Sequence, residues 1–260
     1  MKRVELQAHK GVELEYPENT MVSFRAAVEQ GYDRIELDLR VTKDGQFVVL
    51  HNKTINKTAR LADGSNLAEE TFAADLTFEE LQQYDFGIWR GECFRGERIP
   101  LFSQALELAK EHQIPLKIDN KIMEMTPEQL SRLFEMIAAS GAPVCISCWS
   151  YECAQQVLET IPQAEISFDG LTDPEQLKKL NALAGRDRFT VWLPIDRDMA
   201  KWAPEAWFAT PERVETIRPY AKLGIWAIRD MESFRNACRM YAPDAAETTG
   251  TIKPADAPEC

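Results

Sequence analysis

The chain has 260 residues, of which 45% are apolar and 28% charged, a composition typical of globular proteins. Its formal net charge of −12 excludes a general nucleic-acid binder, because such a protein needs cationic surface to displace counterions. A small anionic ligand is not excluded, since one local lysine or metal ion outweighs a distant field.

No run of 18 or more apolar residues occurs, so we expect no membrane span. The N-terminus, MKRVELQAHKG, lacks an apolar core, so we expect a cytoplasmic protein, or a periplasmic or secreted one if a signal peptide has been removed. Cys145 and Cys148 form a C-x-x-C pair without a second pair or a nearby histidine, so we predict neither a zinc site nor redox chemistry.

Short β-rich runs alternate with helical stretches along the whole chain. Residues 4–9 predict a strand, and residues 18–31 predict a helix that ends at a glycine. Two strands follow on either side of a turn, and from residue 101 onward helices and strands alternate. The predicted strands are 34–41, 46–52, 116–122, 144–149, 165–168, 190–195, 224–228 and 245–249, and the predicted helices include 101–113, 126–141, 173–185 and 231–241.

With residues 34–52 counted as one barrel position, this rhythm predicts an α/β fold, a (β/α)₈ TIM barrel formed as a single domain by residues 1–260. A doubly wound open sheet is the alternative, but no G-x-G-x-x-G follows the first strand. Residues 53–99 are polar, weakly periodic and too long for a plain loop. We therefore predict an inserted cap subdomain there, after the second strand hairpin.

Two carboxylates lie on one face of the predicted strand 34–41. Ile35 and Leu37 point one way, while Glu36 and Asp38 point the other. In a barrel the apolar set meets the helices, so the carboxylates face inward, where neighbouring anions need a cation or a shared proton. A hard divalent ion fits best, whereas a water-exposed acidic strand end is the alternative.

The turn after this strand bears on a histidine. Asp44–Gly45 is a strong hairpin signal, and with these two residues as the turn, Asp38 lies directly opposite His51 on the same face. A change of one residue in loop length would alter this register.

Two further positions join this group. On the predicted strand 116–122, Asp119 shares a face with Lys117 and Lys121, so it could complete a three-carboxylate site while Lys121 holds an anionic oxygen. A buried salt bridge is the alternative. His9 ends the first predicted strand and therefore lies at the C-terminal mouth, where barrel enzymes keep their active sites.

Two histidines, three carboxylates and a lysine at strand ends are suited to metal-assisted cleavage of a phosphodiester. The ion polarises the phosphoryl oxygens, one histidine takes a proton from the nucleophile, and the other protonates the leaving alkoxide.

The motifs AHKG, PENT, IELDLRVTKDGQFVVLH, ERIPLF and LKIDNK follow one another in this order, and with them the chain resembles the glycerophosphodiester phosphodiesterase family. The resemblance covers the first half well and continues weakly through ISCW and GIWAI. It implies a TIM barrel with an insertion after the second strand. It also implies hydrolysis of glycerophosphodiesters to glycerol 3-phosphate and an alcohol, with Mg²⁺ or Ca²⁺.

The resemblance also implies roles for individual residues: His9 and His51 as the acid–base pair, Glu36, Asp38 and Asp119 as metal ligands, Lys121 as the phosphate-facing lysine, and Trp226 as a substrate-pocket wall. Lys10 stands where the family usually has arginine, so a substrate contact there cannot be bidentate. Asp119 replaces a usual glutamate, and AETTG replaces a usual Thr-Asp pair near the C-terminus. Core packing is the alternative role for Trp226.

Two other functions remain open. One is a phospholipase D-like barrel lyase that forms a cyclic phosphate, although PENT and the long insertion favour the hydrolase. The other is a non-catalytic barrel that binds phosphoryl ligands, which would be marked by loss of a histidine or carboxylate, and none is lost. The expected partner is a small-molecule phosphodiester, and the oligomeric state is left open.

Overall fold

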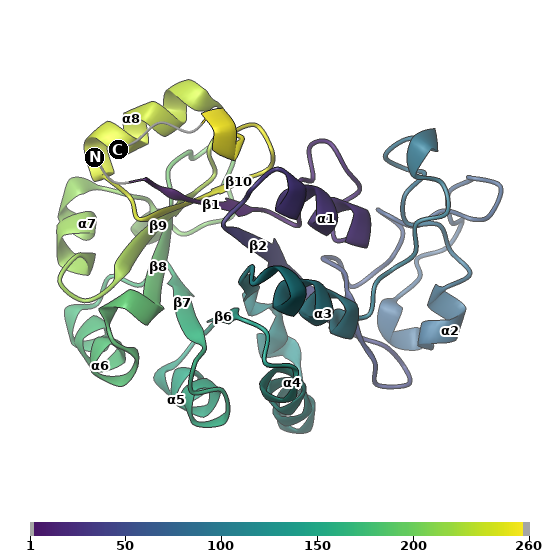
Figure 1. Ribbon diagram of the computed structural model, residues 1–260, viewed down its shortest axis with the longest axis horizontal. Helices are drawn as coiled ribbons and strands as arrows, with labels where there is room; N and C mark the ends of the chain where they lie inside the picture. Colours follow the sequence, from purple (N-terminus) through teal and green to yellow (C-terminus); the bar gives the residue numbers. More distant parts are fainter. Residues whose placement is uncertain (1–2, 257–260) are drawn as a thin grey trace.

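The computed structural model describes residues 3–256, and within this range eight parallel strands close into a barrel (Figure 1). This confirms the predicted (β/α)₈ fold. Around the barrel the neighbour order is β1-β10-β9-β8-β7-β6-β5-β2. The strands are β1 (Glu5–Ala8), β2 (Arg34–Leu37), β5 (Leu116–Ile118), β6 (Val144–Ser147), β7 (Glu165–Asp169), β8 (Phe189–Pro194), β9 (Lys222–Trp226) and β10 (Ala245–Thr248).

Helices connect consecutive barrel strands and cover the outside of the barrel (Figure 1). They are α1 (Met21–Glu29), α3 (Phe102–His112), α4 (Pro127–Ser140), α5 (Tyr151–Thr160), α6 (Pro174–Ala184), α7 (Pro211–Ile217) and α8 (Met231–Tyr241). Helix α4 begins as expected, because Thr126 and Gln129 form a capping box that satisfies orphan N–H groups of the first turn. Its Leu133, Phe134 and Ile137 are buried in the core that surrounds the barrel.

The hairpin that follows β2 differs from the prediction. The chain leaves the barrel at Asp38, and β3 (Leu39–Val41) pairs with β4 (Phe47–Val49) as a separate two-stranded sheet. The N–H of Leu50 donates to the carbonyl of Asp38, so the predicted register, with Asp38 opposite His51, is wrong by one residue. The loop is longer than two residues because the Thr42 hydroxyl accepts the N–H of Gln46 and holds a wider turn.

The predicted strand 116–122 is also shorter than expected. It ends at Ile118, and residues 120–124 form a 3₁₀ turn whose N-cap is Asp119. The Asp119 carboxylate accepts a hydrogen bond from the Lys121 ammonium at 2.8 Å, so these two side chains are in contact although the strand has ended.

The inserted residues 53–99 contain the short helix α2 (Phe78–Leu81) and lie beside the barrel, next to α1 and α3 (Figure 1). They have a small core of their own, which they share with Val48 and Leu50 at the end of the hairpin. Two contacts join them to the loop between β1 and α1: Lys57 pairs with Glu18 at 2.7 Å, and the rings of Tyr16 and Phe94 lie 5.6 Å apart. The segment therefore braces that loop from the side.

Asp85 is the main polar anchor of the inserted segment. Its side chain is buried, and its carboxylate accepts the N–H groups of Gly87 and Ile88 at 2.8 and 2.9 Å. The second oxygen accepts the N–H of Gly96 at 2.7 Å. Burial would raise the pKa of Asp85, but these backbone N–H groups outweigh it and lower the pKa.

Replacing Asp85 with Ala is expected to lower the free energy of unfolding by about 3 kcal/mol at pH 7, because buried N–H groups lose their acceptor. Since the pKa is lowered in the folded state, this stabilisation is complete above the unfolded value of about 4 and is lost as pH falls through the folded value. Urea unfolding at pH 7 and pH 3 would measure both effects. Asp63→Ala is the matched control, since Asp63 is exposed and accepts only from Ser65. Equal stability of the two variants would contradict the anchoring role.

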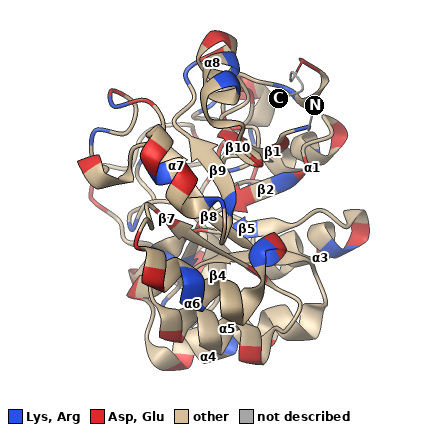
Figure 2. Cartoon of the chain, turned by 90° about the vertical axis from the view of Figure 1, so that its left-hand side faces the viewer, with Lys and Arg blue, Asp and Glu red and all other residues tan. Residues whose placement is uncertain are grey.

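The outer surface is rich in charge. On the side shown in Figure 2, α6 and α7 carry both acidic and basic positions, while the charged positions of α5 are acidic. Within residues 3–256, no helix is both long and apolar enough to cross a bilayer.

Candidate active site

His9 directly follows β1 and begins a tight turn. Its N–H donates to the carbonyl of Thr248 at the end of β10, so the turn is fixed to the closing strand of the barrel. Lys10 and Gly11 both have positive φ, 52° and 80°. A side chain at Gly11 would place its Cβ 2.3 Å from the Ser23 hydroxyl, so only glycine fits this close approach to α1.

The turn brings Glu13 back onto His9. Nδ1 of His9 lies 2.6 Å from Oε1 of Glu13, and both side chains are mostly buried. Burial would lower the pKa of His9, but Glu247, Glu36 and Glu13 outweigh it and raise the pKa to about 10. His9 is therefore held with a carboxylate partner and as an imidazolium.

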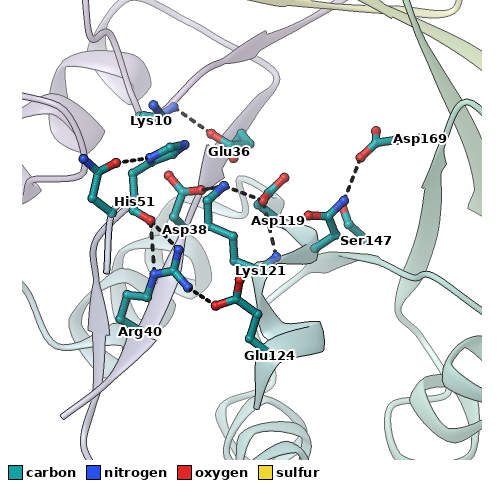
Figure 3. A network of polar contacts seen from close by, with 12 residues as sticks. Lys10, Glu36, Asp38, Arg40, His51, Asp119, Lys121, Glu124, Ser147 and Asp169 are labelled. Carbon is teal, nitrogen blue, oxygen red and sulfur yellow. Dashed lines mark hydrogen bonds and ion pairs between the residues drawn. The ribbon is translucent and has the colours of Figure 1, made fainter. Parts of the chain in front are cut away.

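His51 has a different partner. Its Nδ1 lies 2.6 Å from the amide oxygen of Asn52, and burial lowers the pKa of its ring. The guanidinium of Arg40 donates two hydrogen bonds to the backbone carbonyl of His51, at 2.7 and 3.1 Å, and so fixes the position of the backbone (Figure 3). An amide acceptor with no charge leaves this imidazole neutral.

Glu36 and Asp38 are both buried. Glu36 accepts the backbone N–H of Lys10 at 2.9 Å, and Asp38 accepts the side-chain amide of Asn19 at 2.9 Å. Burial and the neighbouring Asp38 carboxylate raise the pKa of Glu36 to about 8. These side chains lie in a region where negative charge is not fully neutralised.

Lys121 lies between two carboxylates (Figure 3). Its Nζ is 2.7 Å from Oδ1 of Asp38 and 2.8 Å from Oδ2 of Asp119. Burial would raise the pKa of Asp38, but Lys121, His51 and Lys10 outweigh it and lower the pKa. Oδ1 of Asp38 is buried and ion-paired, yet no donor approaches it at a hydrogen-bonding angle.

Two adjoining cavities lie at this end of the barrel. The first, about 390 Å³, is called the carboxylate cavity and is lined by His9, Glu36, Asp38, His51, Lys117, Asp119, Asn120, Lys121, Asp169, Trp202, Trp226 and Glu247. The second, about 330 Å³, is called the tryptophan cavity and is lined by His9, Lys10, Glu13, His51, Met199, Trp202, Trp226, Ala227, Ile228, Glu247, Thr248 and Thr249. Both histidines line both cavities. The structure thus brings every predicted site residue to one place, with Lys10 on the tryptophan cavity alone.

Several cavity residues were not predicted. Lys117 shares the inward face with Asp119, and Glu247 lies in the AETTG departure, so strand alternation could have identified both. Asp169 ends β7, and burial raises its pKa to about 6. Glu13 and Trp202 lie on loops, where no periodic pattern indicates the direction of a side chain.

The donor chemistry of the carboxylate cavity fits a hard divalent ion, because its potential ligands are carboxylate oxygens. Five carboxylates line it against Lys117, Lys121 and the His9 imidazolium. The side-chain positions themselves do not form a metal site: within residues 3–256 no three His, Cys, Asp or Glu side chains are grouped to hold an ion. Lys121 bridges Asp38 and Asp119 and occupies the position between them.

Solved structures of low sequence identity share this fold. A glycerophosphoryl diester phosphodiesterase from Parabacteroides distasonis superposes with a TM-score of 0.73 at 20% identity, over 98% of this chain and 85% of that one. A phosphodiesterase from Oleispira antarctica, in complex with its product sn-glycerol-3-phosphate, superposes with a TM-score of 0.70 at 18% identity, over 96% of this chain and 94% of that one.

The sequence is closer to a curated relative. The glycerophosphodiester phosphodiesterase of Caldanaerobacter subterraneus is 40% identical over 174 residues, which are 64% of this chain and 68% of the relative. The model of the glycerophosphoryl diester phosphodiesterase family matches residues 9–207, most of the barrel together with the inserted segment. The resemblance noted in the motifs is thereby confirmed, and the chain belongs to the glycerophosphoryl diester phosphodiesterase family.

Proposed function

We propose that this chain hydrolyses glycerophosphodiesters to glycerol 3-phosphate and an alcohol, with His9 and His51 as the acid–base pair. The observation that carries the proposal is the pairing of two histidines with unlike partners on one cavity. The family match and the product found in the Oleispira antarctica structure support the same substrate class.

The hydrogen-bond partner of each histidine determines which of the two proton transfers it carries out. If Asn52 accepts the Nδ1 proton of His51, the other ring nitrogen has a free lone pair and acts as the base toward the nucleophile. Glu13 stabilises a protonated His9, so the remaining N–H of His9 is the acid. The nucleophile's oxygen bonds to phosphorus as its proton passes to His51. The bond from phosphorus to the alcohol oxygen breaks as that oxygen takes a proton from His9.

The negative charge of the carboxylate cavity requires a cation, because the substrate phosphodiester is itself an anion. Glu36, Asp38 and Asp119 would hold Mg²⁺ or Ca²⁺, which when bound neutralises charge on the phosphoryl oxygens. Lys121, which pairs with Asp38 and Asp119, would bind a phosphoryl oxygen as a point charge.

Lys10 has a supporting role in this proposal. Its ammonium lies 3.9 Å from Glu18 and 4.0 Å from Glu13, so it stabilises the turn that presents Glu13 to His9. From the tryptophan cavity it can reach substrate only as a single-point donor.

The inserted residues 53–99 remain a proposed cap subdomain. None of them lines the carboxylate or the tryptophan cavity. We infer that they support the β1–α1 loop, through Lys57 and Glu18, and leave substrate selection to other loops.

Release of glycerol 3-phosphate from a panel of glycerophosphodiesters, with Mg²⁺, with Ca²⁺ and with EDTA, tests the proposal. Turnover that needs the ion is expected. ³¹P NMR of the products separates the alternatives, since a lyase yields a cyclic phosphodiester and a non-catalytic binder yields nothing. Either of those results would replace the hydrolase.

A further inference from the structure

Trp202 is the most exposed of the large apolar side chains within residues 3–256, with 70% of its surface accessible. It lies between β8 and α7, at the same end of the barrel as the histidines. Its ring stacks on Trp226, with centroids 5.3 Å apart and planes at 24°, and meets the edge of Trp207. One indole face is therefore covered, while much of the ring remains open to the cavities.

The segment that carries Trp202 is well packed. Ala200, Ala203 and Phe208 form a small buried core against Trp207 and Trp226. A second anchor is polar, since Asp196 at the start of the segment pairs with Arg229 after β9 at 2.8 Å.

Trp207 fixes the segment on the side of β7. A Cβ on Gly170 would lie 2.1 Å from the Trp207 ring, so the indole occupies space that only glycine leaves free. Trp202 is thus presented by a pre-organised loop, and a large exposed aromatic held in this way indicates a binding surface.

The roles proposed for the histidines and the carboxylates determine which part of the substrate lies near Trp202. His9, the proposed acid, lines both cavities, and Lys121 and the metal-binding carboxylates are confined to the carboxylate cavity. Lys121 and these carboxylates would hold the phosphoryl group in the carboxylate cavity, and the leaving oxygen must touch the acid His9. The leaving alcohol then extends past His9 into the tryptophan cavity.

The walls of the tryptophan cavity favour a cation. Indole faces attract cations through the ring quadrupole, and Trp is the strongest of the aromatic residues in this respect. Glu13 and Glu247 add two carboxylates to the lining and balance Lys10 and the His9 imidazolium, so the indole faces supply the attraction for a further cation. The one lysine there, Lys10, already lies within 4.0 Å of Glu13 and Glu18, so it opposes a second cation only weakly.

We propose that the tryptophan cavity is a subsite for an alkylated ammonium group on the leaving alcohol, with Trp202 and Trp226 as its aromatic wall and Trp202 as the specificity-determining residue. The subsite rests on the proposed hydrolase function for its place in the reaction. It predicts a preference for choline-type over neutral leaving alcohols of the same shape.

The test compares glycerophosphocholine with the glycerophosphodiester of 3,3-dimethylbutanol. This alcohol has the shape of choline but carries no charge. The ratio of kcat/KM for the charged over the neutral substrate is expected to fall about 3- to 30-fold in Trp202→Leu, the range for one cation–π contact. Because each enzyme is measured with both substrates, the different leaving-group reactivities cancel. Trp202→Phe is expected to retain part of the preference.

Trp149→Leu is the matched control, since Trp149 is also partly exposed but lines neither cavity. It is expected to leave the ratio unchanged. An unchanged ratio in Trp202→Leu, or an equal loss for both substrates, would overturn the proposal, because the wall would then be merely apolar or unused.

Binding of choline chloride, followed by tryptophan fluorescence or calorimetry, separates this proposal from the hydrolase function. Wild type is expected to bind choline more tightly than 3,3-dimethylbutanol, and Trp202→Leu is expected to lose that difference. If no diester is cleaved but this binding pattern appears, the hydrolase function fails and the subsite stands. If diesters are cleaved and choline binds no better than the neutral alcohol, the subsite fails alone.

Discussion

An aryl leaving group is expected to restore much of the turnover of a His9→Ala variant and little of the turnover of His51→Ala. With alkyl diesters, either change is expected to lower kcat by about 10²–10⁴-fold, the usual effect of losing a general acid or base. An aryloxide leaves without protonation, so it bypasses the proposed acid His9. It still requires activation of the nucleophile, which is the proposed role of His51.

Steady-state kinetics of both variants with an alkyl and a p-nitrophenyl glycerophosphodiester would measure this. His112→Ala is the control for removing an imidazole, since His112 lies at the end of α3 and lines neither cavity. The double variant is expected to lose far less than the product of the two single losses, because residues that act as a unit are not additive. Equal recovery of both single variants, or of neither, would contradict the assignment.

The unlike partners of the histidines could not be read from the sequence. Glu13 is four residues after His9, but only the left-handed conformations of Lys10 and Gly11 turn the chain so that Glu13 returns to the ring. Asn52 is adjacent to His51, and adjacency alone does not indicate a contact. Loop conformation therefore determines which histidine is charged.

The strands were easier to predict because their side chains alternate. Alternation alone placed Glu36 and Asp38 on the inward face, and the structure has both buried beside the carboxylate cavity. The same rule applied to β10 would have identified Glu247. The hairpin was wrong by one residue because the Thr42 side chain, which has no periodic signature, widens the turn. His51 reaches the cavity even so.

Contacts between loops that are distant in the chain could not be predicted from the sequence. Trp202 gains its place from a loop core and from the absence of a side chain at Gly170, about thirty residues earlier. No local pattern distinguishes it from Trp149, which lies outside both cavities. The aromatic wall is therefore a property of the fold.

Removal of divalent ions is expected to abolish turnover, and Glu36→Gln is expected to do the same in the presence of Mg²⁺ or Ca²⁺. A bound ion contributes several kcal/mol of charge stabilisation in the transition state. Its loss therefore lowers the rate by about 10³-fold or more. Zinc is expected to substitute poorly, since the proposed ligands Glu36, Asp38 and Asp119 are all oxygen donors.

Thermal unfolding gives a readout independent of activity. An ion at about 100 times its Kd stabilises the folded state by about 2.7 kcal/mol, which corresponds to a rise in Tm of roughly 5–10 °C for a chain of this size. Glu36→Gln is expected to lose this rise. Without metal at pH 7, however, the variant is expected to melt at a higher temperature than wild type, because a neutral amide of the same shape avoids the cost of burying a carboxyl whose pKa burial and Asp38 raise to about 8.

A Glu36→Gln variant that melts higher than wild type without metal and loses the rise in Tm with metal identifies Glu36 as a metal ligand. A carboxylate that only supports the fold would not give both results. Asp173→Asn is a suitable control for removing a carboxylate, since Asp173 caps α6 outside both cavities and is expected to change neither the ion dependence nor the rise in Tm. A purely structural Glu36 would give a Gln variant that is less stable without metal and keeps its response to the ion. The negative charge of the carboxylate cavity is then best understood as stability given up in the metal-free protein so that an ion and an anionic substrate can bind together.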